Sequence, residues 1–290
     1  MATPPFTPSP LAHPSNIITS PGAPYRFTLL TPRLLRFEYS PTHSFTDAPS
    51  TFALHRGAFP PVNYTVKSNA AADPDTGNAA EGTGQGGFEI ITEGMHVDYD
   101  GGVFGPSGLV VDVKGRTTLW GTQWRYGVEQ RGGEWGNLGG TARTLDEVEG
   151  RCEVEGGVCS REGFAVVDDS GTMVFEEVEG GKGEWWVRGR KGKEEGEVDG
   201  YLFAYGRDYK SAVRDLYRLS GRQPVVPRWA LGNWWSRYYR YTEEEYLGLM
   251  DRFEEREVPL SVAVIDMDWH LTYDERVPHA GWTGVSDTFL

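Results

Sequence analysis

The sequence predicts a β-sandwich followed by a βαβ unit, within a chain of 290 residues. Two observations predict this order. Short runs rich in β-branched and aromatic residues recur from residue 25 to residue 205, separated by glycine-bearing turns, and this spacing is typical of a sandwich. After residue 228 the pattern changes to an apolar run, a capped amphipathic helix and a second apolar run, which indicates two parallel strands joined by a helix.

The predicted sandwich spans residues 25–205. Its strands are expected at Tyr25–Leu30, Leu34–Tyr39, Phe88–Thr92, Met95–Tyr99, Leu109–Val113, Phe164–Val167, Met173–Phe175, Trp185–Arg188 and Tyr201–Tyr205. The segment 69–87, rich in Ala, Gly and Asp, is predicted to be a loop, and the charges of segment 179–200 are interpreted as a solvated hairpin tip. Residues 1–24 are rich in proline and lack a hydrophobic pattern, so we expect a mobile arm there.

A helix and an extended joint are predicted at residues 206–227, between the sandwich and the βαβ unit. Asp208 is placed as the N-cap, and Gly221 is placed where the helix ends. The apolar stripe of this helix comprises Tyr209, Ala212, Val213, Leu216 and Tyr217. The prolines of the stretch QPVVP keep residues 223–227 extended.

The final segment, residues 228–290, carries the strongest local signals. An apolar run, Trp229–Trp235, ends in two tryptophans. Thr242 and Glu245 then form a capping box. The helix after this box is expected to bury Tyr246, Leu249, Met250 and Phe253. Pro259 is expected to stop the helix, and Leu260–Ile265 follows as a strand buried on both faces.

Polar and aromatic residues follow directly after this second strand, in the order Asp266-Met267-Asp268-Trp269. In parallel α/β folds, chemistry collects at the carboxyl ends of strands. We therefore interpret this strand end as a candidate site that presents two carboxylates and an indole ring.

Three separated motifs resemble glycoside hydrolase family 31, the family of α-glucosidases, α-xylosidases and related α-transglycosylases. The stretches ALGNWWSRYYRYTEEE, PLSVAVIDMDWH and GWTG resemble the start of its catalytic barrel. The earlier stretches NLGGTARTLDEVEGRCEVEGGVCSREGFAVVDDS and LRFEYSPTHSFTDAPSTFALHR resemble its amino-terminal sandwich. The resemblance runs from about residue 33 to residue 284 and implies a galactose-mutarotase-like sandwich followed by a (β/α)₈ TIM barrel.

The predicted barrel is incomplete in this sequence. A closed (β/α)₈ barrel needs about 250 residues, whereas 64 residues follow Val226. The resemblance implies a retaining glycosidase acting on an α-linked oligosaccharide or glycoside, with both catalytic aspartates on later strands, beyond Leu290. We therefore expect this chain alone to be inactive. Two alternatives stay open: a non-catalytic carbohydrate-binding sandwich, and a truncated gene product.

The resemblance implies substrate contacts for Asp266, Asp268 and Trp269. The alternative for Asp268 is that it caps the following loop. Asp266 and Asp268 lie two residues apart on one side of a strand, with Cα atoms about 6.5–7 Å apart. Both would reach a sugar from the same face, whereas retaining chemistry needs attack and protonation from opposed directions, so we assign them to binding and not to catalysis.

Five further residues are candidate substrate contacts, each with a structural alternative. Trp235 ends the first barrel strand, but either Trp234 or Trp235 must face the helices, because neighbours on a strand alternate. Arg237 is either a subsite residue or the partner of a local carboxylate. The remaining candidates are Trp282, Arg143 and Asp146. The alternative for Trp282 is packing in a lid, and for Arg143 and Asp146 it is an ion pair within their own turn.

Composition excludes several other function classes. The net charge of −14 argues against nucleic acid as a partner, and no run approaches the roughly 20 apolar residues of a membrane span. We expect no metal and no cofactor, since the sequence lacks ligand spacing and phosphate-binding motifs. Cys152 and Cys159 flank Gly156-Gly157, which suggests a hairpin turn, and we expect free thiols. No secretory signal is recognised, which favours the cytoplasm.

Overall fold

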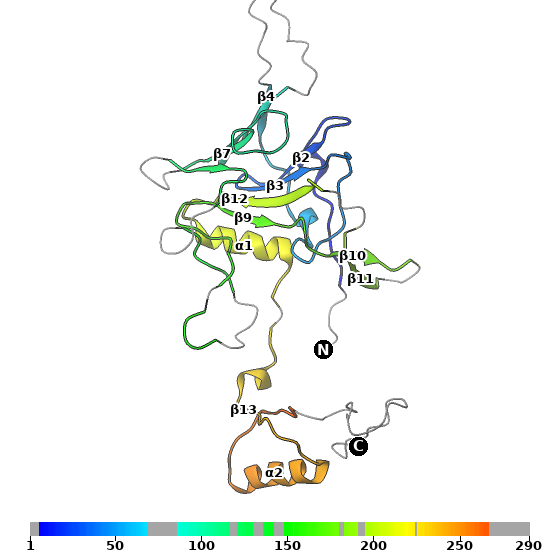
Figure 1. Ribbon diagram of the computed structural model, residues 1–290, viewed down its shortest axis with the longest axis vertical. Coiled ribbons are helices and arrows are strands. Elements are labelled where there is room, and N and C mark those ends of the chain that lie inside the picture. The colour runs from blue at the N-terminus through cyan, green and yellow to red at the C-terminus, as the bar shows by residue number, and fades with distance from the viewer. Residues whose placement is uncertain are drawn as a thin grey trace, which may run out of the picture. The chain divides into compact units, whose positions relative to one another are not determined.

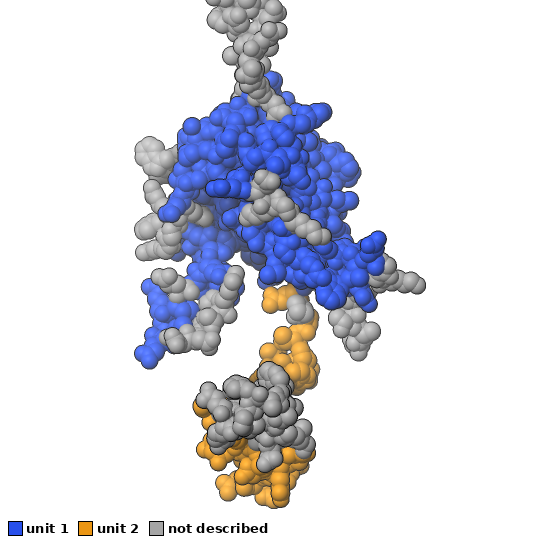
Figure 2. Space-filling view, turned by 45° about the vertical axis from the view of Figure 1, so that its right-hand side comes forward, with its two compact units in different colours: residues 1–222 blue, residues 223–290 orange. Residues whose placement is uncertain are grey.

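The computed structural model describes most of the chain. The described residues are 6–68, 86–115, 121–129, 136–141, 148–152, 154–179, 183–190, 195–223 and 225–266. The chain divides into two compact units, Met1–Arg222 and Gln223–Leu290 (Figures 1 and 2). The division predicted from the sequence, at residues 24, 205 and 227, stays a prediction.

The described residues of the first unit form two five-stranded antiparallel sheets and a hairpin. Sheet I has the order β1 (Ile17–Ile18), β2 (Tyr25–Thr31), β3 (Leu34–Tyr39), β12 (Val198–Phe203) and β9 (Ala165–Asp168). Sheet II is a meander of β4 (Thr65–Ser68), β5 (Phe88–Ile91), β6 (Met95–Tyr99), β7 (Leu109–Val113) and β8 (Gln123–Arg125). The separate hairpin pairs β10 (Val174–Glu177) with β11 (Trp185–Arg188).

The inner faces of the two sheets share one hydrophobic core. Alternate residues of β2 and β3 point into it, among them Phe27 and Phe37, and sheet II contributes Val97, Val111 and Trp124. Aromatic rings dominate the core and pack edge to face, as aromatic quadrupoles favour. The first unit is therefore a pair of packed antiparallel sheets, as the strand spacing predicts. The galactose-mutarotase-like arrangement stays a prediction.

The outer face of sheet I is covered by the helix α1 (Tyr209–Ser220), which lies along β9 and β12 in Figure 1. Its Ala212 and Leu219 join a second core with residues of the outer face, including Leu34 and Phe203. The predicted cap is confirmed, because Asp208 accepts a hydrogen bond from the Ser211 amide. The predicted stop is also confirmed, since Gly221 follows the helix with a φ of 94° that favours glycine.

The second unit contains the predicted βαβ pattern. Strands β13 (Trp234–Trp235) and β14 (Val262–Ala263) pair in parallel, and helix α2 (Glu243–Glu255) connects them. A 3₁₀ turn (Arg228–Leu231) precedes β13. The capping box of Thr242 and Glu245 is present with both of its hydrogen bonds. The structure describes two strands in this unit, and these two do not form a closed barrel.

Several local features differ from the sequence prediction. Helix α2 ends before Pro259, because Glu257 adopts a left-handed conformation with a φ of 53°. Strand β14 is half-buried to exposed and not buried on both faces, since it pairs with β13 on one side. Part of the predicted arm is ordered, as Ile17–Ile18 pairs with β2. The predicted loop 69–87 lies mostly outside the described residues.

The glycine pair Gly156-Gly157 does not form the expected hairpin turn. The Gly140 amide donates to the Glu155 carbonyl, and the Leu138 amide donates to the Cys159 carbonyl, so this glycine pair lies in one arm of a ribbon. Both cysteines are free thiols in the structure. Among the described residues, no helix is long and apolar enough to cross a membrane.

Candidate functional site

Asp266 lies three residues after β14, at the carboxyl end of the parallel pair. The ladder continues past the strand, because the Val264 amide donates to the Trp235 carbonyl at 2.9 Å. Alternation along this extended segment puts Asp266 on the same side as Val262 and Val264. The side chain of Asp266 is exposed, so its carboxylate is open to a ligand at this strand end.

The aromatic pair of β13 divides between the two sides of the small sheet. Trp235 packs against helix α2, with ring centroids 5.9 Å from Tyr246 and 5.6 Å from Phe253. Trp234 pairs in register with Val262, so it lies on the side of Asp266, and 53% of it is exposed. The sequence leaves open which tryptophan faces the helix, and the structure assigns that position to Trp235. Its predicted contact with substrate stays a prediction.

Arg237 follows β13 and lies among aromatic rings. Its guanidinium stacks 4.4 Å above the centroid of Tyr239, and its Nη1 donates to the Tyr241 hydroxyl at 3.4 Å. The sequence offered two roles for this arginine, as a subsite residue or as the partner of a carboxylate. Its contacts among the described residues are with tyrosines, which hold an exposed cation near the strand end.

The other candidate residues lie outside the described residues. They are Asp268, Trp269, Trp282, Arg143 and Asp146. Their contacts with substrate therefore stay predictions. Among the described residues, no group of three or more His, Cys, Asp or Glu side chains could hold a metal ion.

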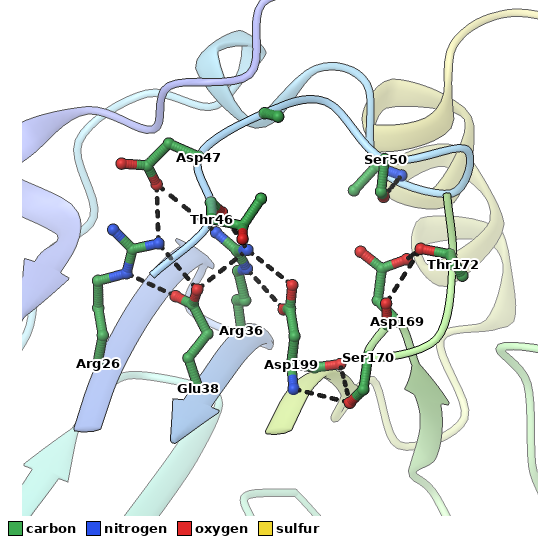
Figure 3. Close-up of polar contacts among 12 residues, drawn as sticks. Arg26, Arg36, Glu38, Thr46, Asp47, Ser50, Asp169, Ser170, Thr172 and Asp199 are labelled. Carbon is green, nitrogen blue, oxygen red and sulfur yellow. Dashed lines mark hydrogen bonds and ion pairs between the residues drawn. The ribbon is translucent and has the colours of Figure 1, made fainter. Parts of the chain in front are cut away.

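A second polar cluster, which the sequence analysis missed, lies on the outer face of sheet I (Figure 3). Arg36 makes two hydrogen bonds of 2.8 Å to Asp199 and one ion pair of 3.0 Å to Glu38. Arg26 donates to Glu38 at 2.7 and 2.8 Å. The side chains of Arg36, Glu38 and Asp199 are at most 7% exposed, so these charges are paired away from water.

The cluster extends to the segment that was interpreted as a solvated hairpin tip. Arg190 donates to Asp199 at 2.7 Å and to Asp169 at 3.0 Å, so that interpretation is wrong for this residue. Burial alone would raise the pKa of Asp199, but the guanidiniums of Arg36 and Arg190 outweigh it and hold that pKa well below its ordinary value. Burial and the Asp199 charge raise the pKa of Asp169. Because each carboxylate is paired, the cluster is a structural element of the sheet.

A known protein family matches the second unit of the chain. Residues 223–284 match the domain described as the Glycosyl hydrolases family 31 TIM-barrel domain. This segment is similar to the barrel domain of glycoside hydrolase family 31. The matched segment contains β13, α2, β14 and Asp266, so the candidate site lies within it.

Two curated proteins match short stretches of the chain. "Alpha-glucosidase 2" of Bacillus thermoamyloliquefaciens is 38% identical over 76 residues, which are 26% of this chain and 10% of that protein. "Alpha-xylosidase" of Saccharolobus solfataricus is 30% identical over 82 residues, which are 28% of this chain and 10% of that protein. Each match thus spans a tenth of the relative's own length.

Solved family 31 structures are also similar to the chain at low identity. A family 31 α-xylosidase from a soil metagenome, complexed with xylose, gives a TM-score of 0.48 at 13% identity. That comparison covers 90% of this chain and 42% of the other.

Proposed function

We propose that this chain is part of a retaining α-glycosidase of family 31 that acts on α-glucosides or related α-glycosides in carbohydrate metabolism. The observation that carries this proposal is the position of Asp266, exposed at the carboxyl end of β14 within the matched segment. The names of the two curated relatives, an α-glucosidase and an α-xylosidase, support the substrate class.

The proposed role of Asp266 is to accept hydrogen bonds from hydroxyl groups of the sugar at the cleaved bond. A hydrogen bond to a charged acceptor contributes about 1.5–3 kcal/mol. Trp234 lies on the same side of the sheet and would offer an apolar ring face to the same sugar. Asp268, Trp269, Trp282, Arg143 and Asp146 complete the proposed pocket.

The bond-breaking groups of the proposed reaction are assigned to other residues. A retaining enzyme needs two carboxyl groups about 5–5.5 Å apart, on opposed sides of the scissile bond. Asp266 and Asp268 are two residues apart in the sequence, so on an extended strand both would point to one side, which suits binding and not this pair of roles. We therefore propose that the nucleophile and the acid–base residue come from later barrel strands, and that this chain alone is inactive.

A chimera tests the role of Asp266. Residues 223–284 of this chain would replace the matching segment of the Bacillus α-glucosidase, and hydrolysis of an aryl α-glucoside would be measured. Asp266→Asn should lower kcat/KM by about 10²-fold or more, corresponding to about 2.7 kcal/mol of lost transition-state binding. Asp251→Asn, the same change at an exposed position of helix α2, should leave kcat/KM unchanged.

Melting temperature separates a binding role from a structural one. If Asp266→Asn lowered the melting temperature of the chimera while its folded fraction kept normal kcat/KM, Asp266 would be structural and the proposal would fail. Activity of the unextended 290-residue chain, abolished by Asp266→Ala, would contradict the assignment of the catalytic carboxylates to later strands.

A further inference from the structure

A cleft opens at one edge of the sandwich, between the edge strands β8 of sheet II and β9 of sheet I. Its volume is about 540 Å³, within the range of about 300–1,000 Å³ that small-molecule sites occupy. Its lining includes Phe37, Trp124, Tyr126, Val128, Asp168 and Glu197. This cleft lies in the first unit, outside the segment matched to the barrel.

The floor of the cleft is aromatic and held in place by the core. The ring centroids of Phe37 and Trp124 are 5.0 Å apart, and those of Trp124 and Tyr126 are 6.3 Å apart. Phe104, a core residue, packs against Phe37 at 6.1 Å and against Tyr126 at 5.4 Å. Phe37 and Trp124 are 2% and 4% exposed and support the floor from beneath, so Tyr126 is the ring open to a ligand. A ring held in this way loses little conformational entropy when a ligand packs on it.

Glycine is required beside this floor. Gly200 lies directly across from Phe37 in the β3–β12 register. A Cβ atom at residue 200 would approach the Phe37 ring to 2.3 Å. The ring therefore occupies the space of the missing side chain, and it lies across the floor of the cleft because residue 200 is glycine.

The rim of the cleft supplies hydrogen-bond acceptors. Asp168 is exposed and accepts from the Ser170 amide at 2.9 Å through Oδ1, and Glu197 accepts from the Ser40 hydroxyl at 3.2 Å through Oε1. Each carboxylate has further lone pairs to offer. Burial, and then the negative charge of Asp168, raise the pKa of Tyr126, as expected for a phenol that stays protonated and able to donate.

The charge of the lining restricts the class of ligand. Among the described residues, the lining carries two carboxylates and no basic side chain. An anionic ligand, such as a phosphorylated or acidic sugar, would meet uncompensated repulsion there. The ligand must combine an apolar face for the aromatic floor with several hydroxyl donors for the rim.

We propose that this cleft binds a neutral sugar, through packing of its C–H face on the partly exposed ring of Tyr126 and donation of its hydroxyls to Asp168 and Glu197. The lining residues of this site do not include Asp266, and the proposal does not depend on the proposed glycosidase function. It would let the first unit hold carbohydrate independently of the barrel.

Calorimetric titration of the 290-residue chain tests the proposal, with maltose, isomaltose and xylobiose as neutral probes. We expect saturable binding of at least one probe, accompanied by a change in tryptophan fluorescence. Asp168→Asn keeps the Oδ1 acceptor for Ser170 and removes the charge, so it should weaken binding about tenfold. Val128→Arg, at a rim position that is 52% exposed, should abolish binding by filling the cleft.

The controls locate the site and define the ligand class. Asp251→Asn, on helix α2, should leave the affinity unchanged, and all variants should keep the melting temperature of the unmodified chain because these positions are exposed. Sugar binding that survives both Asp168→Asn and Val128→Arg would place the ligand elsewhere and overturn the proposal. It would also be overturned if none of the neutral probes bound. Choline is added to the titration as a cationic probe for the two carboxylates, and binding of choline without binding of any sugar would overturn the proposal as well.

Discussion

Replacing Arg36 with methionine removes the central cation of the buried cluster and keeps most of the aliphatic stem of the side chain. The Arg36 side chain is 3% exposed and bonds to Glu38, Asp199 and the Thr46 carbonyl. After the replacement, Glu38 keeps its pair with Arg26 and Asp199 keeps its pair with Arg190, both at 2.7 Å. Each carboxylate thus loses one of two guanidinium partners.

The expected cost follows from this arrangement. Removing one partner of a buried ion pair destabilises a protein by about 3–5 kcal/mol, because a buried charge is left uncompensated. Since Glu38 and Asp199 each keep one guanidinium partner, we expect the lower end, about 3 kcal/mol. For a unit of this size, each kcal/mol lowers the melting temperature by about 2–4 °C, so the melting temperature should fall by about 6–12 °C.

The assay is urea unfolding of the chain, followed by far-ultraviolet circular dichroism, with Arg33→Met as the matched control. Arg33 pairs with Asp208 at 3.5 Å, and the two side chains are 39% and 45% exposed. Exposed pairs of this kind contribute about 0–1 kcal/mol, so the control should lose less than about 1 kcal/mol. An equal loss in Arg33→Met and Arg36→Met would refute the argument that burial sets the cost.

Three further predictions concern the first unit. Stability should fall as the pH drops below about 4, because unfolded Asp199 binds a proton there while the folded carboxylate, whose pKa lies below its ordinary value, stays ionised. In Asp199→Asn the urea midpoint should therefore fall less steeply with decreasing pH, and an unchanged pH dependence would contradict this. Gly200→Ala should cost about 1–3 kcal/mol in urea unfolding, since its methyl group overlaps the Phe37 ring, and a neutral effect would mean that the ring moves freely. Limited proteolysis should leave a resistant fragment ending near Arg222, and equal protection of the later residues would argue against a second unit that is less stable than the first.

The elements that could be predicted from the sequence are those with local causes. The bounds of β3, β6, β7 and β11 agree with their hydrophobic runs. Helix α1 has its cap at Asp208 and its stop at Gly221, and α2 has its capping box. In each case the determining residues lie within a few positions of one another, so the pattern alone specifies the conformation.

The features that escaped prediction depend on residues far apart in the chain. Arg36 and Asp199 are 163 residues apart, and each has the appearance of a solvent-facing charge on an alternating strand. Their burial becomes evident only when β3 and β12 pair and Arg190 joins them. The sequence could not decide between Trp234 and Trp235 for a related reason. Neighbouring side chains on a strand point to opposite sides, and only the packing of α2 against β13 determines that Trp235 is the one that faces the helix.

The order of strands in sheet I has a consequence for how the chain folds during synthesis. Sheet II is a meander of consecutive strands, so its contacts are local and can form early. Sheet I joins β3 to β12, and its pairing must wait until residue 203 has left the ribosome. In that interval the apolar inner faces of β2 and β3 have no completed sheet around them, and the nascent chain is most exposed to aggregation before its last strand arrives.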